Sequence, residues 1–199
     1  SFHMVLAHAS SIGGLRMIDR HKEYVRMAAG LDSDNYLSSE SIQRGLQCLK
    51  RFAERLQDVP VDHIRCVGTN TLRQARNASD FLEEGEAILG RRIDIVSGLE
   101  EARLVYQGVM LEAPQAGRRL VIDIGGGSTE IILGTEKGPE RLDSMHVGCV
   151  STTSRFFQEG LVLDASMRAA ILNSKRQLQH LYPDLRGQFE FALGSSGTI

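Results

Sequence analysis

The sequence predicts an α/β fold, because short apolar segments of strand length alternate along it with longer segments of helical periodicity. It has 199 residues, of which 42% are hydrophobic and 24% are charged, so one large domain or two small ones can bury a sizeable core. The formal net charge of −2 gives no sign of a nucleic-acid partner. An anionic substrate would therefore have to be held by local features rather than by an overall positive field.

The first part of the chain is expected to contain strands and one long helix. Residues 2–8 have strand character, and residues 15–26 form one or two further strands of alternating character. Turn-forming residues follow at 31–35. Ser38 or Ser39 is then expected to cap an amphipathic helix, whose apolar residues recur at three-and-four spacing.

The alternation continues through the middle of the chain. A short strand is expected at 64–68, and a helical stretch at 69–89 with a break near Asn77. A further strand at 93–96 leads into a helix at about 100–111. This order of elements is typical of α/β proteins.

The turn-rich segment 112–117 is a candidate domain boundary. After it we expect two strands joined by a glycine turn, a third strand, a long helix and a last strand before a terminal glycine loop. Their expected ranges are 119–124, 129–134, 139–147, 164–181 and 189–193.

The glycine turn carries the most informative chemistry. If its tight turn is formed by Gly126 and Gly127, Asp123 faces Glu130 across the hairpin, with Cβ atoms about 5 Å apart, and Ser128 shares their face. Two carboxylates this close repel each other unless one is protonated or a cation lies between them. Mg²⁺ prefers such oxygen ligands, and glycines let backbone N–H groups approach a phosphate. The alternative is a conformationally favoured hairpin with two solvated acids at its rim.

A second candidate group lies where the chain passes from a strand into a helix. Ser97 and Glu100 have the spacing of a capping box, which gives Glu100 a structural role. Glu101 has no such role, and the first turn beyond a strand end commonly faces the ligand crevice of an α/β sheet. It could equally be a surface acid favoured by the helix dipole. At another strand-to-helix junction, Arg73 is positioned either to bind phosphate or to remain solvated.

Other reactive residue types give little signal. Three cysteines (Cys48, Cys66 and Cys149) are widely spaced without a CxxC pair, which favours reduced thiols in a cytosolic protein over a zinc site or disulfides. Six scattered histidines lack metal-ligand spacing, and neither a G-x-S-x-G elbow nor a P-loop is present. No apolar run is long enough to span a bilayer. The chain starts in a strand-like stretch without Met, so a fragment of a longer protein is expected.

Taken together, these stretches resemble the exopolyphosphatase/guanosine pentaphosphate phosphohydrolase family, which belongs to the actin-like, sugar-kinase and Hsp70 ATPase superfamily with its ribonuclease H-like fold. Similar motifs occur in the same order over nearly the whole chain. They are SFHMVLA at 1–7, LRQARN at 72–77, SGLEEARLVYQGV at 97–109, VIDIGGGSTE at 121–130, GCVS at 148–151 and GSSGTI at 194–199.

The resemblance implies two actin-like lobes: the first over 1–114, lacking its first strand and phosphate loop, and the incomplete second over 115–199. It implies that Glu101 is the general base, and that Asp123 and Glu130 are ligands of Mg²⁺ or Mn²⁺. It also implies a larger set of substrate-binding residues. These are Ser1, Arg73, Gly125, Gly126, Gly127, Ser128, Gly194, Ser196, Gly197 and Thr198.

The function implied by the resemblance is release of terminal orthophosphate from inorganic polyphosphate by an exopolyphosphatase. The alternatives are hydrolysis of guanosine pentaphosphate to the tetraphosphate in the stringent response, a non-catalytic module that binds polyphosphate or an alarmone, and an ATP-dependent kinase or ATPase. The triple glycine and the LRQARN stretch favour polyphosphate. The resemblance further implies a cytoplasmic homodimer when full length, with no integral membrane segment; peripheral membrane association stays open.

Overall fold

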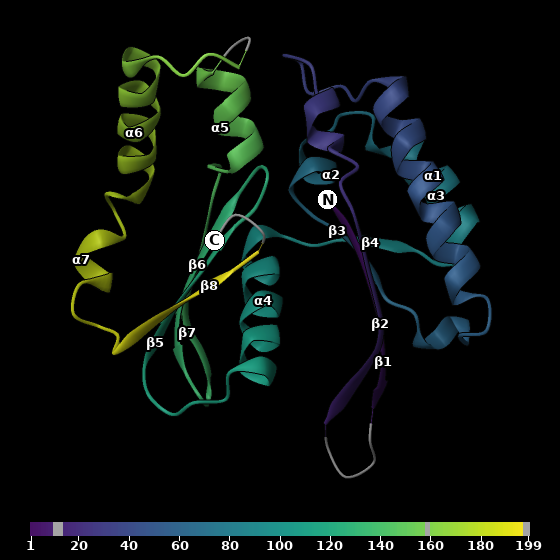
Figure 1. Cartoon of the computed structure of the whole chain (residues 1–199), viewed down its shortest axis with the longest axis horizontal. Coiled ribbons are helices and arrows are strands. Elements are labelled where there is room, and N and C mark those ends of the chain that lie inside the picture. The colour runs from purple at the N-terminus through teal and green to yellow at the C-terminus, as the bar shows by residue number, and fades with distance from the viewer. Residues whose placement is uncertain (10–13, 158–159, 197–199) are drawn as a thin grey trace. The chain divides into compact units, whose positions relative to one another are not determined.

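The computed structural model describes residues 1–9, 14–157 and 160–196. The chain divides into two compact units, which are described separately (Figure 1). The first unit comprises Ser1–Gly68 and Gln74–Asp94, and the second comprises Thr69–Arg73 and Ile95–Ile199. The bounds of these units differ from those of the two lobes expected at 1–114 and 115–199; the two lobes stay a prediction about the longer protein.

The first unit begins with an antiparallel hairpin of β1 (Phe2–Ala9) and β2 (Leu15–Glu23). A short 3₁₀ helix, η1 (Met27–Gly30), precedes the long helix α1 (Ser39–Leu56). The hydroxyl of Ser38 accepts a hydrogen bond from the N–H of Ser41, which confirms the predicted N-cap.

The elements between residues 61 and 95 follow the predicted alternation; among them, Thr69–Arg73 belong to the second unit. After η2 (Val61–His63) come β3 (Cys66–Gly68), α2 (Asn70–Gln74), α3 (Ala78–Leu89) and β4 (Ile93–Ile95), of which β3 and β4 form a two-stranded sheet. The predicted break near Asn77 is confirmed. Its carboxamide accepts a hydrogen bond from the Leu37 N–H (2.8 Å) and donates one to the Leu37 carbonyl (3.1 Å), so the side chain joins two segments at the start of α3.

The second unit is built on a four-stranded sheet of order β7-β6-β5-β8, in which β8 runs parallel to β5 and the other pairs are antiparallel. The glycine turn joins β5 to β6, as predicted. The strands are β5 (Arg119–Ile124), β6 (Thr129–Thr135), β7 (Gly138–Met145) and β8 (Phe191–Ser195).

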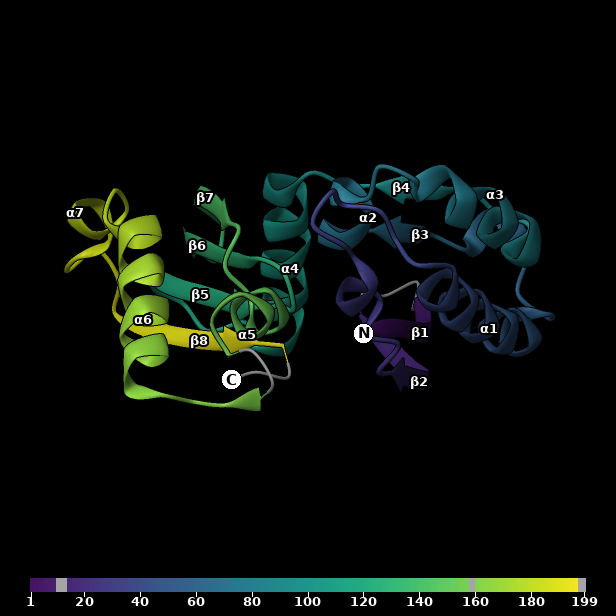
Figure 2. The same cartoon turned by 90° about the horizontal axis from the view of Figure 1, so that it is seen from above.

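Helices cover both faces of this sheet (Figures 1 and 2). Ala102 and Tyr106 of α4 (Gly98–Glu112) pack on Val121 and Ile132 on one face. On the other face, a cluster around Leu181 contacts the sheet next to α7 (Tyr182–Leu185). The helix expected at 164–181 ends at Leu178 as α6 (Asp164–Leu178), and α5 (Cys149–Phe156), which precedes it, was not expected from the sequence.

The described helices include none with the length and apolar character that a bilayer crossing requires.

Candidate functional site

The hairpin of β5 and β6 has the register that its glycine turn predicted. Asp123 is the partner of Glu130 and Ile124 that of Thr129, while the N–H of Gly125 donates to the carbonyl of Ser128 (2.9 Å). Side chains alternate between the faces of a sheet, so both carboxylates lie on the face that α4 covers. This arrangement brings the predicted pair together beneath the first turn of α4.

Glu130 is buried, with only 1% of its surface exposed. Burial raises the pKa of its carboxyl to about 7, and the negative charges of Glu101 and Asp123 act in the same direction. Hydrogen bonds from the hydroxyls of Ser144 and Ser128 act against this rise, and the Ser144 Oγ lies 2.9 Å from Glu130 Oε1. A carboxyl in this environment can be stabilised by a proton or by a cation.

Asp123 lies next to it with an incompletely satisfied carboxylate. Burial raises its pKa, the charge of Glu101 adds to the rise, and a hydrogen bond with Ser196 opposes it. Within the described ranges, its buried Oδ1 has no hydrogen-bond partner. A buried oxygen without a partner is costly, so this atom marks a place where a ligand would be favourable.

Glu101 is held above this pair by an arginine. The hydroxyl of Ser97 caps α4 by accepting from the N–H of Glu100, which places Glu101 in the first turn. The Nη1 of Arg73 donates to Glu101 Oε2 (2.9 Å) and to the carbonyl of Val96 (2.7 Å). Arg73, which was predicted to contact phosphate, therefore also orients Glu101, the predicted general base. Among the described residues the bonds of its guanidinium all leave from Nη1, so Nη2 and Nε remain available for a phosphate.

The capping box predicted from Ser97 and Glu100 is only half formed, and the prediction is wrong for Glu100. Its carboxylate does not return to the start of the helix but pairs with Arg103, at 2.7 and 2.6 Å. An arginine three residues along the helix offers two charged N–H donors, which bind a carboxylate more strongly than one backbone N–H.

The first turn of α5 fixes the glycine turn from the other side. The N–H groups of Cys149, Val150 and Ser151 donate to the carbonyls of Gly125 and Gly126, at 2.8 to 3.0 Å. These bonds satisfy donors at the start of a helix and direct the two carbonyls toward α5. A phosphate loop needs its N–H groups, not its carbonyls, to face the anion.

Gly148 makes this close approach feasible. A Cβ added there would lie 2.5 Å from backbone atoms of Gly126 and Gly127. Gly148→Ala is therefore expected to displace the turn or α5 and to lower the free energy of unfolding by about 1–3 kcal/mol. Urea unfolding of the chain measures this change.

Gly108→Ala is the matched control, because an added Cβ at this exposed helix position meets nothing within 4 Å. It is expected to leave stability unchanged or raise it by about 0.5–1 kcal/mol. Equal effects of the two substitutions would contradict the close packing at Gly148.

Two residues of the site escaped prediction from the sequence. Ser144 on β7 bonds to Glu130 and also lies close to Gly98, where an added Cβ would be 2.3 Å from its Oγ. Asn70 is buried against the glycine turn, and a Cβ on Gly127 would lie 2.0 Å from its Nδ2. Asn70 stood in the strand-to-helix segment that predicted Arg73, but Ser144 had no local signal.

The remaining predicted residues are placed as follows. Gly194 was expected in a terminal loop, but it lies in β8 because that strand pairs with β5 as far as Ser195. Ser196 follows with a left-handed backbone (φ 75°) and bonds to Asp123. Gly197 and Thr198 lie outside the described residues. Ser1 belongs to the first unit. Substrate contacts of these residues remain predictions.

A divalent cation fits the chemistry of this site. Asp123 and Glu130 offer carboxylate oxygens, one of them without a hydrogen-bond partner in the described part of the chain, and both groups have raised pKa values that a nearby cation would offset. The described residues include no group of three or more His, Cys, Asp or Glu side chains arranged to hold a metal. Two protein ligands with water and phosphate are a common set for Mg²⁺.

Comparison with known proteins gives a consistent result. The model of the Ppx/GppA phosphatase family matches residues 5–199. A guanosine-5'-triphosphate,3'-diphosphate pyrophosphatase of Aeromonas hydrophila is 42% identical over 200 residues; the match covers 100% of this chain but only 40% of that protein. The chain therefore spans about 40% of the length of that relative.

Solved structures agree with the fold. The crystal structure of an exopolyphosphatase-like protein matches with a TM-score of 0.89 at 25% identity, over 98% of this chain and 62% of that chain. An Aquifex aeolicus PPX-GPPA enzyme matches with a TM-score of 0.78 at 23% identity, over 99% and 64% of the two chains. These likenesses confirm the predicted actin-like α/β fold.

Proposed function

The chain belongs to the Ppx/GppA phosphatase family, and from this premise we propose that its complete protein hydrolyses the terminal phosphoanhydride bond of guanosine 5'-triphosphate 3'-diphosphate. The observation that carries the proposal is the placement of Glu101 over the buried pair of Asp123 and Glu130, beside a glycine turn whose carbonyls point away toward α5. The proposed base and the two buried carboxylates thus lie on one side of the sheet, and the glycine turn joins the two strands that bear these carboxylates.

In this mechanism the side chains position the reactants and move one proton. The N–H groups of the glycine turn and the free nitrogens of Arg73 bind the terminal phosphate. Glu101, held by Arg73 and the Val96 carbonyl, accepts a proton from a water molecule as its oxygen attacks phosphorus. The bond from phosphorus to the bridging oxygen breaks, which releases orthophosphate and the guanosine tetraphosphate.

Asp123 and Glu130 would hold Mg²⁺ or Mn²⁺, which supplies positive charge against the terminal phosphates. Ser144 and Ser128 orient Glu130 through their hydroxyls, so that one carboxylate oxygen is fixed toward β7. The protein contribution is thus largely positioning and electrostatic stabilisation, as in other phosphoryl transfers.

The choice of substrate is supported by similarity rather than by the site. The relative at 42% identity is named for the guanosine nucleotide, which matches the alternative that the sequence left open and not the polyphosphate that it favoured. The named exopolyphosphatase-like structure is more distant, at 25% identity. The terminal anhydride is the same chemical group in both substrates, so the reacting residues do not discriminate between them.

We expect the complete protein to release phosphate chiefly from guanosine pentaphosphate, with a higher kcat/KM than for polyphosphate at equal concentration of chain ends. Phosphate release is measured for both substrates in parallel, with Mg²⁺ and with a chelator in its place. Release chiefly from polyphosphate would overturn the proposed substrate in favour of an exopolyphosphatase. Binding of either compound without release would instead favour a non-catalytic module.

A further inference from the structure

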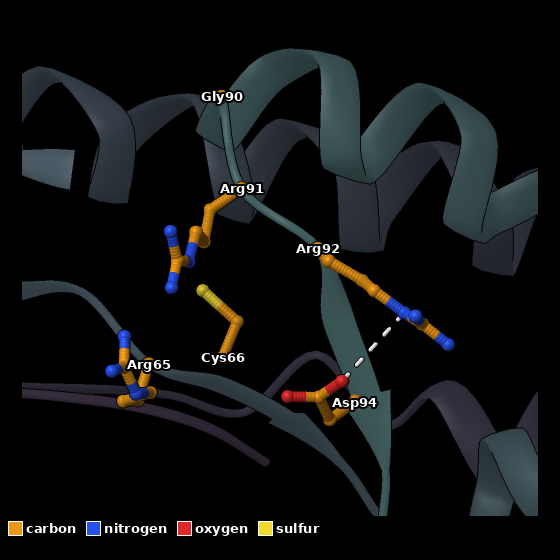
Figure 3. Close-up of a pocket in the computed structure, with 6 residues that line it drawn as sticks. All are labelled: Arg65, Cys66, Gly90, Arg91, Arg92 and Asp94. Carbon is orange, nitrogen blue, oxygen red and sulfur yellow. Dashed lines mark ion pairs between the residues drawn. The ribbon is translucent and has the colours of Figure 1, made fainter. Parts of the chain in front are cut away.

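A second place in the molecule has the character of an anion site, and it lies wholly within the first unit (Figure 3). A surface pocket of about 340 Å³ opens where β3 starts and α3 ends. No large apolar side chain lines it, which argues against an apolar ligand. Its lining consists of Arg65, Cys66, Gly90, Arg91, Arg92 and Asp94.

The charge of this lining is strongly positive. Three guanidinium groups face a single carboxylate, that of Asp94, which pairs with Arg92 at 3.7 Å. Figure 3 shows the Arg92 side chain directed away from Cys66, toward Asp94. The guanidinium groups of Arg65 and Arg91 instead lie on the side of the Cys66 sulfur, and both form hydrogen bonds to Asp62.

These two guanidinium groups are only weakly neutralised. Arg91 reaches the carboxylate of Asp62 at 3.5 Å, but that side chain is 89% exposed, and ion pairs this exposed to water contribute little. Nη1 of Arg65 donates to the carbonyls of Asp62 and Ile64 at 3.1 and 3.0 Å. These carbonyls fix the guanidinium without cancelling its charge, and no carboxylate in the described part of the chain pairs with it.

The floor of the pocket does not oppose an anion. Cys66 is half-buried, and this burial raises the pKa of its thiol, although the charge of Arg91 acts in the other direction. The thiol is therefore neutral near pH 7 and does not repel a negative ligand. Its sulfur lies beside the guanidinium of Arg91 and can report on a ligand bound there.

We propose that Arg65 and Arg91 form a binding site for a phosphate group, separate from the catalytic cluster. The planar fork of a guanidinium presents paired N–H donors that match the oxygens of a phosphate, and a second fixed fork adds charge and orientation. A phosphate has more charge than the exposed carboxylate of Asp62 and replaces it at Arg91. The group belongs either to an inorganic polyphosphate or to a nucleotide, and both carry the same chemistry.

The test uses Cys66 as a reporter on the intact chain. Its rate of alkylation by N-ethylmaleimide is followed by peptide mass spectrometry, with tripolyphosphate or guanosine 5'-diphosphate as the probe and sodium chloride to equalise ionic strength. At a probe concentration about ten times Kd, occupancy lowers the rate about tenfold. The buried Cys48 serves as an unreactive internal reference.

Arg91→Ala is expected to abolish this protection, whereas the adjacent Arg92→Ala, whose side chain points away, keeps it. Each variant is compared with and without probe, so a change in its intrinsic thiol reactivity cancels. Protection by either probe supports the site, and the probe with the lower Kd identifies the source of the phosphate. Absence of protection by both probes, or equal protection in Arg91→Ala, overturns it.

Discussion

Replacing Glu101 with glutamine is expected to lower kcat of the complete protein by about 10²- to 10⁴-fold, with little change in substrate affinity. Glutamine has the same shape and its carbonyl oxygen can still accept the hydrogen bond from Arg73, so the local structure is retained. It cannot accept a proton from the attacking water. Single-turnover phosphate release measures the chemical step, and equilibrium binding of guanosine pentaphosphate measures affinity.

Glu100→Gln is the matched control, one position earlier in the same helix turn. Its carboxylate pairs with Arg103 and its side chain is 40% exposed, so its loss is expected to leave kcat within about twofold. Equal turnover of the Glu101→Gln and parent proteins would rule out Glu101 as the base. A loss of affinity as large as the loss of kcat would instead assign it to binding.

Much of the fold followed from local signals. The glycine turn set the register of β5 and β6, because a tight turn between residues 125 and 128 admits one pairing of the strands. Ser38 and Ser97 capped their helices as predicted. Each of these features depends on residues a few positions apart, which a sequence displays directly.

The acidic residues of the candidate site could be predicted from the sequence, but the residues that hold them in place could not. Glu101, Asp123 and Glu130 could be found because each stands at a strand end or beside glycines. Ser144 could not, because its contact with Glu130 depends on the pairing of β7 with β6. The contact of α5 with the glycine turn could not be predicted either, because it brings residues 148–151 against residues 125–126, which are distant in the sequence. Such contacts depend on tertiary packing.

The ion pair of Arg73 with Glu101 shows the same limit. The sequence placed both residues at strand-to-helix junctions and gave Arg73 a role at the phosphate. The structure adds that the arginine holds the carboxylate, since Arg73 and Glu101 both belong to the second unit and form an ion pair there. A phosphate bound at the remaining nitrogens of Arg73 would therefore couple substrate binding to the orientation of Glu101.

The buried acids should also govern stability in the absence of metal, and Glu130→Gln isolates this effect. The pKa of Glu130 is about 7 in the folded chain and about 4.5 in an exposed state. Its contribution to stability is therefore complete below about pH 4.5 and is lost as the pH rises through 7. The total loss is on the order of 3 kcal/mol. Glutamine keeps the hydrogen bond from Ser144 but cannot ionise.

In a chelating buffer, Glu130→Gln is therefore expected to unfold at nearly the same urea concentration as the parent near pH 5, and at a clearly higher one near pH 8. At pH 8, added Mg²⁺ should raise the urea midpoint of the parent but leave that of Glu130→Gln unchanged. Glu100→Gln should instead differ from the parent by the same small amount at both pH values, because Arg103 lowers the pKa of Glu100 and its carboxylate is ionised throughout this range. If the difference in unfolding midpoint between Glu130→Gln and the parent stays constant with pH, the pKa of Glu130 is not raised in the folded chain, and its ionised form needs no cation to stabilise it.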